Sequence, residues 1–173
     1  MFEIGGRVIY RAEGVCVIND IRSERFGNSG EEQYYVLSPL NDPRSTVFVP
    51  LANERLVSMM RPLLFAAELM EMVKDTEEDR LEWHGDSRNR NAQWREILSV
   101  GHPRQLMVMI RTIREHLSPE IADGMRATGI DLAAKTRAEK LLLDECSVTT
   151  DLSTVEKLDE LFQGKWIPKD RES

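Results

Sequence analysis

Hydrophobic and polar residues alternate in short runs over the first sixty positions. Each run is rich in valine, isoleucine or tyrosine, and glycine, asparagine or proline separates it from the next. Such runs, joined by tight turns, are typical of β-strands in small all-β domains. We therefore predict four or five strands that form a small, strongly bent barrel. The runs are residues 7–10, 15–21, 34–37 and 45–50, and the turns are residues 13–14, 27–30 and 41–44.

The last of these runs has the pattern of an exposed edge strand. An edge strand presents unpaired backbone groups, and a partner strand can add to it. We predict that this edge binds a protein partner through residues Thr46, Val47, Phe48 and Val49, together with Phe26 from the preceding loop. Phe26 and Phe48 are the candidate side chains for specificity, although each of them could instead fill the interior of the barrel.

After residue 61 the hydrophobic spacing changes to three and four, which is the period of an α-helix. Pro62 and the Ser118-Pro119-Glu120 segment read as helix starts, since proline favours the first helical position. Trp94, Ile97, Leu98 and Gly101 share one helical face, so we assign Trp94 to the core. The predicted helices cover residues 62–73, 88–98, 105–116, 131–146 and 153–162, and one more is expected to start at 118–120.

The change of period predicts an α+β protein with two domains. Residues 1–60 form the β domain, residues 61–163 form a helical domain, and residues 164–173 form a tail that is either frayed or docked by Trp166. A chain of 173 residues is long enough for two small domains.

Composition narrows the class of protein. With 41% hydrophobic and 31% charged residues, the chain is neither collagenous nor wholly disordered. Cys16 and Cys146 lack metal-ligand or disulfide-framework spacing, which fits a reducing compartment. No apolar run approaches the ~20 residues that cross a bilayer, and no signal peptide is evident. We therefore expect a cytoplasmic protein with no membrane contact, a monomer when free.

Catalytic motifs are not evident. His84, His102 and His116 form no metal-ligand pair, and acidic runs such as residues 75–79 fit solvated helix faces. Gly5-Gly6 alone does not make a phosphate loop. We expect a protein that is not an enzyme and that binds no cofactor or metal.

The distribution of charge along the chain indicates a surface that binds a polyanion. Six arginines and a single acid, Glu96, lie between Arg88 and Arg114, so this window carries +5, whereas the whole chain carries −7. Arginine binds phosphate with a planar fork of donors. Trp83 lies just before the window and is a candidate wedge against a base step, with core packing as the alternative. The candidate DNA-binding residues are Trp83, Arg88, Arg90, Arg95 and Arg104.

The order of these features resembles the CarD/CdnL family of bacterial transcription regulators. The resemblance covers about residues 1–148 and rests on the opening Met-Phe-Glu-Ile-Gly-Gly-Arg-Val-Ile-Tyr, then Glu13-Gly14-Val15, and on several later segments. These are residues 34–37, residues 47–50, Trp83, Arg88-Asn89-Arg90, residues 94–101, residues 107–114 and residues 138–142.

The resemblance implies a Tudor-like N-terminal barrel that binds the β subunit of RNA polymerase. It also implies that the helical domain binds promoter DNA at the upstream edge of the transcription bubble. A Trp of that domain, matched here by Trp83, would wedge into the minor groove and stabilise the open complex. Arg88 and Arg90 would contact the backbone beside it. The alternative is a protein–protein interaction module with no direct DNA contact, which the net charge of −7 favours.

Overall fold

The computed structural model describes residues 1–28 and 30–169, and in it the chain divides into two compact units. The first unit ends at Leu63 and the second begins at Leu64. The predicted boundary at residue 60 falls inside a short strand, so the observed division lies three residues later. The predicted loop 27–30 includes Ser29, and the predicted tail includes residues 170–173; these positions lie outside the described residues.

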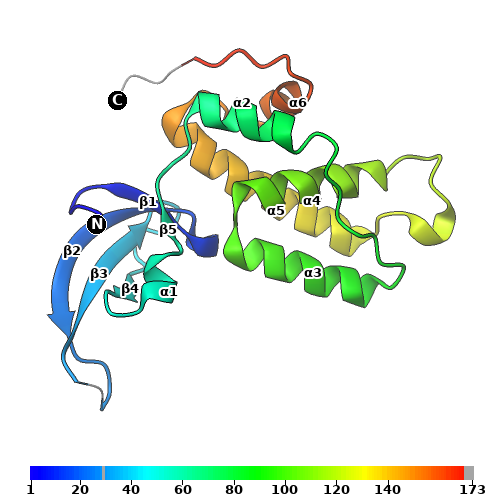
Figure 1. Ribbon diagram of the computed structural model, residues 1–173. Helices are drawn as coiled ribbons and strands as arrows, with labels where there is room; N and C mark the ends of the chain where they lie inside the picture. Colours follow the sequence, from blue (N-terminus) through cyan, green and yellow to red (C-terminus); the bar gives the residue numbers. More distant parts are fainter. Residues whose placement is uncertain (29, 170–173) are drawn as a thin grey trace. The chain divides into compact units, whose positions relative to one another are not determined.

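The first unit is a five-stranded antiparallel sheet with the strand order β4-β3-β2-β1-β5 (Figure 1). β4 and β5 are the outer strands, and among the described residues no backbone pairing joins them. The predicted barrel is therefore not closed by backbone hydrogen bonds. The strands are β1 (Arg7–Tyr10), β2 (Val15–Glu24), β3 (Glu32–Pro39), β4 (Val47–Pro50) and β5 (Met60–Arg61), with a 3₁₀ turn at Arg11–Glu13 and helix α1 at Glu54–Val57.

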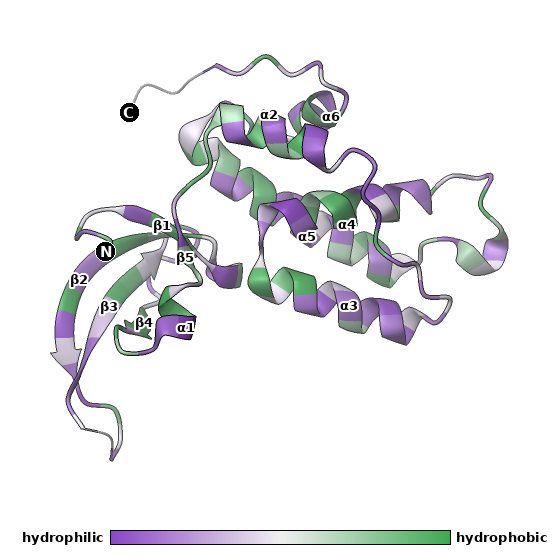
Figure 2. Cartoon of the chain, in the orientation of Figure 1, coloured by the Kyte–Doolittle hydropathy of each residue, from purple (hydrophilic) through white to green (hydrophobic). Residues whose placement is uncertain are grey.

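A bulge in β2 keeps the hydrophobic side chains of that strand on one face. Cys16 and Ile18 are completely buried, and the register with β3 shifts between Ile18 and Asp20. The extra residue moves the inward positions from even to odd numbers, so that Ile21 also packs against the core. Figure 2 shows the resulting bands of hydrophobic and hydrophilic residues along β2.

The second unit consists of five helices around one hydrophobic core. Trp94 is completely buried, as predicted, and α4 contributes the most buried side chains of any helix. Trp166 is also buried, so the described part of the predicted tail is docked. The helices are α2 (Ala66–Asp75), α3 (Ser87–Val100), α4 (Pro103–Glu115), α5 (Gly129–Thr149) and α6 (Val155–Phe162), with a 3₁₀ turn at Asp123–Met125.

Two predicted helix starts are wrong. Pro62 follows β5 rather than starting a helix, and α2 begins after Phe65, whose N–H donates to the Glu68 carboxylate at 2.9 Å. Ser118-Pro119-Glu120 lies in a folded loop, because the Arg126 guanidinium donates to the carbonyls of Pro119 and Ile121 and holds the chain in turns.

Candidate functional site

The outer strand β4 leaves one of its backbone edges open. It pairs with β3 in the register Tyr35↔Val49 and Val36↔Phe48, and among the described residues no strand pairs with its other side. Leu51 N–H donates to the Gln33 carbonyl at 2.9 Å, so residues 33 and 51 are a hydrogen-bonded pair. Hydrogen-bonded and non-hydrogen-bonded pairs alternate along an antiparallel ladder. Phe48 is therefore in a non-hydrogen-bonded pair, and its N–H and C=O point to the open edge.

Pro50 lies at the next such position along β4. It faces Tyr34 in the register, and it has no N–H to leave unpaired. The open edge thus offers one complete donor and acceptor pair at Phe48 and ends in a carbonyl at Pro50. This arrangement is suited to a short added strand, because the proline stops further pairing.

Three aromatic rings lie together on the outer face of the sheet beside this edge. Phe26 packs edge-to-face against Tyr34 and Phe48, with ring centroids 5.2 and 5.0 Å apart. Arg22 lies 5.9 Å from the Phe48 ring centre. Phe26 remains 46% exposed, so the cluster offers an apolar surface. The Tyr34 hydroxyl has a raised pKa, first because burial removes water and then because Glu32 is nearby.

The predicted protein-binding residues separate into two groups. Val49 is completely buried and Val47 packs against the core, so these two residues can take part in the predicted contact only through their backbone. Thr46 is exposed and precedes β4. Phe26 and Phe48 lie on the outer face rather than inside the sheet's core, which resolves the alternative left by the sequence.

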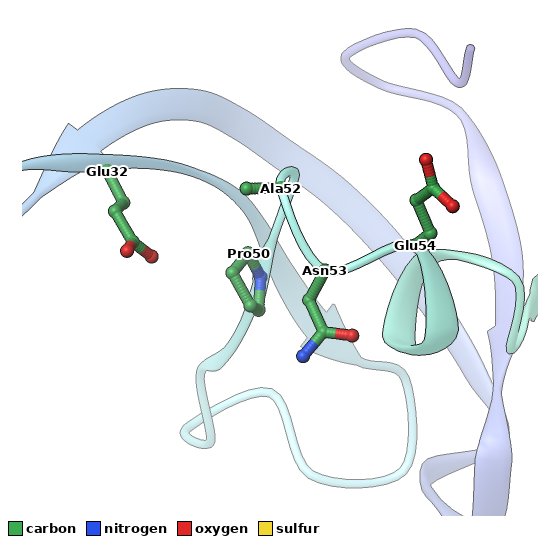
Figure 3. Close-up of a pocket in the computed structure, with 5 residues that line it drawn as sticks. All are labelled: Glu32, Pro50, Ala52, Asn53 and Glu54. Carbon is green, nitrogen blue, oxygen red and sulfur yellow. The ribbon is translucent and has the colours of Figure 1, made fainter.

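A hollow adjoins the end of β4. It has a volume of about 470 Å³ and is lined by Glu32, Pro50, Ala52, Asn53 and Glu54. Figure 3 shows the Glu32 and Glu54 side chains at opposite sides of Pro50 and Asn53. Among the described residues, no ion pair joins either carboxylate to a cation.

In the second unit, Trp83 is held by three neighbours. Its ring stacks on the His116 ring with the centroids 3.7 Å apart, and it lies 6.2 Å from the Trp94 ring. The Arg90 guanidinium carbon lies 4.5 Å from the Trp83 ring centre. His116 is itself fixed, because its Nδ1–H donates to the Thr112 carbonyl at 2.9 Å. Trp83 is half-buried, so it is neither a free surface side chain nor a full member of the core.

Arg90, one of the predicted DNA-binding residues, is buried and paired within the helical unit. Its side chain is 2% exposed and forms a bidentate pair with Asp131, at 3.0 and 2.9 Å. Its Nη1 donates to the carbonyls of His84 and Gly85. A guanidinium with these partners cannot reach a phosphate without unfolding the start of α3.

Asp131 is the centre of this buried group. Its carboxylate also accepts hydrogen bonds from Trp94 Nε1–H at 2.8 Å and from both the N–H and the hydroxyl of Thr128. Burial by itself raises the pKa of the Asp131 carboxyl, but these hydrogen bonds outweigh it and hold the pKa well below its usual range. Asp131 therefore ties the starts of α3 and α5 together.

Three of the other arginines in the +5 window are also held by groups of the helical unit. Arg104 lies beside Asp75 and Asp79, and Arg114 pairs with Glu139 and Asp159. Arg111 is buried and donates to carbonyls at the end of α2, and burial lowers its pKa. Four of the six arginines in the window, Arg90 included, are therefore paired or buried and do not share one open basic face.

Arg88 and Arg95 are the two exceptions. Both are exposed on α3, and among the described residues neither has an ion-pair partner. They are seven positions apart, which places them on one helical face about 10 Å from each other. Ala92 and Ser99 are exposed on the same face. This narrow stripe is the part of the predicted DNA-binding set that is free to bind a phosphate.

Nothing in the described residues indicates a catalytic centre. No group of three or more His, Cys, Asp or Glu side chains could hold a metal there. Burial, with a smaller effect of Glu13, raises the pKa of the Cys16 thiol to about 12, which favours the protonated thiol. None of the helices in the described part of the chain has the length and apolar character needed to cross a membrane.

Sequence reasoning missed two residues of this site. The sequence predicts Asp131 only as the first residue of a helix, although a Thr-x-x-Asp spacing from Thr128 is a helix-capping signal. No local signal in the sequence shows that the His116 ring lies against Trp83. The distances of 41 and 33 positions along the chain hide both contacts from any short motif.

Comparison with known families identifies the first unit. Residues 2–64 match the family model described as the CarD-like/TRCF RID domain, a domain that interacts with RNA polymerase. No curated protein matches the chain significantly. The resemblance to the CarD/CdnL family is therefore confirmed for the N-terminal part of the chain. The first unit matches this family of RNA polymerase-interacting domains, and the helical unit lies outside the match except for Leu64.

Proposed function

We propose that the chain is a transcription regulator that binds the β subunit of RNA polymerase through the open edge of β4. The family match of residues 2–64 is the observation that carries this proposal. The sheet supports it, because Phe48 directs an unpaired N–H and C=O outward beside an exposed aromatic surface. Strand addition takes affinity from such backbone groups and specificity from alternate side chains.

The proposal extends to promoter DNA at the upstream edge of the bubble. The helical unit would contact the backbone through Arg88 and Arg95 on α3, while Trp83 stacks in the minor groove against the exposed base step and slows bubble closure. His116 and Arg90 hold the Trp83 ring in place, so the ring would lose little conformational freedom on binding. In this role the protein is a cytoplasmic monomer, and its binding to RNA polymerase brings it to promoter DNA.

A protein–protein interaction module without DNA contact is the second candidate. It is favoured by the charge of the helical unit, in which residues 64–173 carry 22 acidic and 16 basic side chains, a net charge of −6. Four of the six arginines in the basic window are paired or buried, which also favours it. The two functions share the polymerase contact and differ in the partner of the helices.

The polymerase contact is tested by comparing Phe48→Pro with Phe48→Ala in binding to purified bacterial RNA polymerase. Both changes remove the ring, but only proline also removes the N–H at the open edge. Since this N–H does not bond to β3, proline leaves the β3–β4 ladder intact. We expect Phe48→Ala to weaken binding several-fold and Phe48→Pro to weaken it by about a further tenfold, the value of one backbone hydrogen bond. Equal affinities of the two variants would refute strand addition at β4.

A further inference from the structure

The hollow at the end of β4 continues the outer face that carries the aromatic cluster. Side chains directly opposite each other in a ladder lie on the same face, and every second residue along a strand returns to it. Tyr34 faces Pro50, so Glu32, Tyr34, Phe48 and Pro50 share the outer face. The aromatic surface and the hollow are therefore successive parts of one surface along the open edge.

The hollow is negatively charged and lacks a counter-ion of its own. Glu32 accepts a hydrogen bond from the Tyr34 hydroxyl at 3.4 Å, which ties the carboxylate to the aromatic cluster. Glu54 lies in the first turn of α1 and is exposed. Among the described residues no lysine or arginine forms an ion pair with either glutamate. A cation brought by a partner would therefore find unpaired carboxylates on two sides of the hollow (Figure 3).

The register of an added strand determines which of its side chains reach the aromatic surface and which reach the hollow. The partner residue that pairs with Phe48 through the open N–H and C=O has its side chain on the same face as Phe48. The partner residue two positions along returns to this face about 6.6–6.8 Å away, opposite Pro50. The first side chain thus lies over the aromatic cluster, and the second lies over the hollow.

We propose that the segment of RNA polymerase that pairs with β4 carries an apolar side chain at the position facing Phe48. Two residues along, on the same face, it carries a lysine or arginine that enters the hollow between Glu32 and Glu54. This inference rests on the strand pairing of the proposed function and deepens it, because it names the chemistry of the partner strand. The backbone gives affinity at this edge, and the apolar–x–basic pattern gives specificity.

The test compares charge reversals in the full chain for binding to purified RNA polymerase. Glu32→Lys and Glu54→Lys each place a positive charge in the hollow, and Glu31→Lys is the matched control. Glu31 is an exposed neighbour that does not line the hollow, and its reversal changes the net charge equally. We expect the Kd to rise about tenfold for each hollow variant and less than twofold for the control. A similar rise for all three variants, or no rise for the hollow variants, would overturn the proposal.

The partner strand supplies the second arm of the test. Hydrogen exchange on the complex identifies the polymerase segment that becomes protected, and its basic residue is then changed to glutamate. This change is expected to weaken binding to the wild-type chain and to restore binding to Glu32→Lys. A protected segment without a basic residue two positions from an apolar one would contradict the inference.

The failure of this inference is distinguishable from the failure of strand pairing. If Phe48→Pro and Phe48→Ala bind equally, the pairing at β4 is wrong and the deduced register is lost with it. If Phe48→Pro is the weaker binder but Glu32→Lys and Glu54→Lys bind like the wild type, the pairing holds and only the basic side chain in the hollow is refuted.

Discussion

Asp131 illustrates how much of the helical unit depends on one carboxylate. It is completely buried and accepts hydrogen bonds from the side chains of Arg90, Trp94 and Thr128. A buried ion pair is costly to break, because removing one partner leaves the other charge unpaired. The same carboxylate fixes Arg90, which lies over Trp83.

Changing Asp131 to asparagine is expected to lower the free energy of unfolding by ~3–5 kcal/mol, the usual cost of leaving a buried charge unpaired. The pKa of Asp131 is depressed in the folded state, so its contribution is complete above the unfolded pKa of about 4 and is lost as the pH falls below it. Denaturant unfolding at pH 7 and at pH 3 measures both effects. A variant with unchanged stability at pH 7, or with the wild-type loss of stability in acid, would contradict this role.

Trp83 has a structural role and a proposed role in DNA binding, and the Trp83→Ala variant allows the two to be measured separately. Because the ring is half-buried against His116, Trp83→Ala should lower the free energy of unfolding by ~2–3 kcal/mol, less than a fully buried tryptophan would. Base stacking worth ~1–3 kcal/mol predicts an open-complex lifetime shortened about five- to a hundred-fold. Thermal unfolding and open-complex decay on the same protein measure the two effects.

Trp83→Phe is the matched control for this comparison. It keeps an aromatic ring against His116 and should recover most of the stability, while its smaller ring recovers only part of the open-complex lifetime. If Trp83→Ala unfolds at a lower temperature but leaves the lifetime unchanged, Trp83 is a structural residue alone and the proposed DNA contact is wrong.

At the scale of the elements, local patterns predicted most strands and helices correctly. β1 matches the predicted residues 7–10, and the predicted runs at 34–37 and 45–50 overlap β3 and β4. The two wrong helix starts lie where proline was read as a first helical residue, but side-chain hydrogen bonds distant from that proline decide the conformation. β5 was missed because two residues carry no periodic signal, and their pairing with β1 is a tertiary contact.

The arginines between Arg88 and Arg114 show why the sequence alone could not predict which residues of the site are free to bind DNA. Its arginines are adjacent in the sequence, but successive positions on a helix point in different directions, so they reach different partners. Arg104, Arg111 and Arg114 turn toward acids or carbonyls between 25 and 45 positions away. Only the fold shows which charges remain free, and it leaves Arg88 and Arg95.

This reduced set makes a quantitative prediction for α3. If only Arg88 and Arg95 contact phosphates, the log–log salt slope of DNA binding should be about 2 in magnitude, whereas six arginines would give about 5. Arg88→Gln with Arg95→Gln should bring the slope close to zero. Arg104→Gln is the control and should leave it unchanged, because Arg104 already lies beside Asp75 and Asp79. A pre-melted promoter fragment titrated at several salt concentrations provides the measurement, and a slope near 5 would contradict this assignment.

At the scale of the whole molecule, a unit with a family match is joined to a helical unit whose activity is proposed. The first unit matches a family of RNA polymerase-interacting domains, and the proposed contact is the open edge of its sheet. The second unit is acidic overall, so it is expected to bind DNA weakly when isolated. Attachment through the first unit would raise its effective concentration at the promoter to about millimolar.

The most direct test of the central claim is amide hydrogen exchange at β4 in the free protein and in the complex with RNA polymerase. The Phe48 N–H points to the open edge, so it should exchange quickly in the free protein, while the N–H of Val49, which bonds to β3, exchanges slowly. Strand addition predicts that the Phe48 amide becomes protected in the complex at least tenfold. Unchanged exchange at Phe48, with protection at another surface of the chain, would contradict the account.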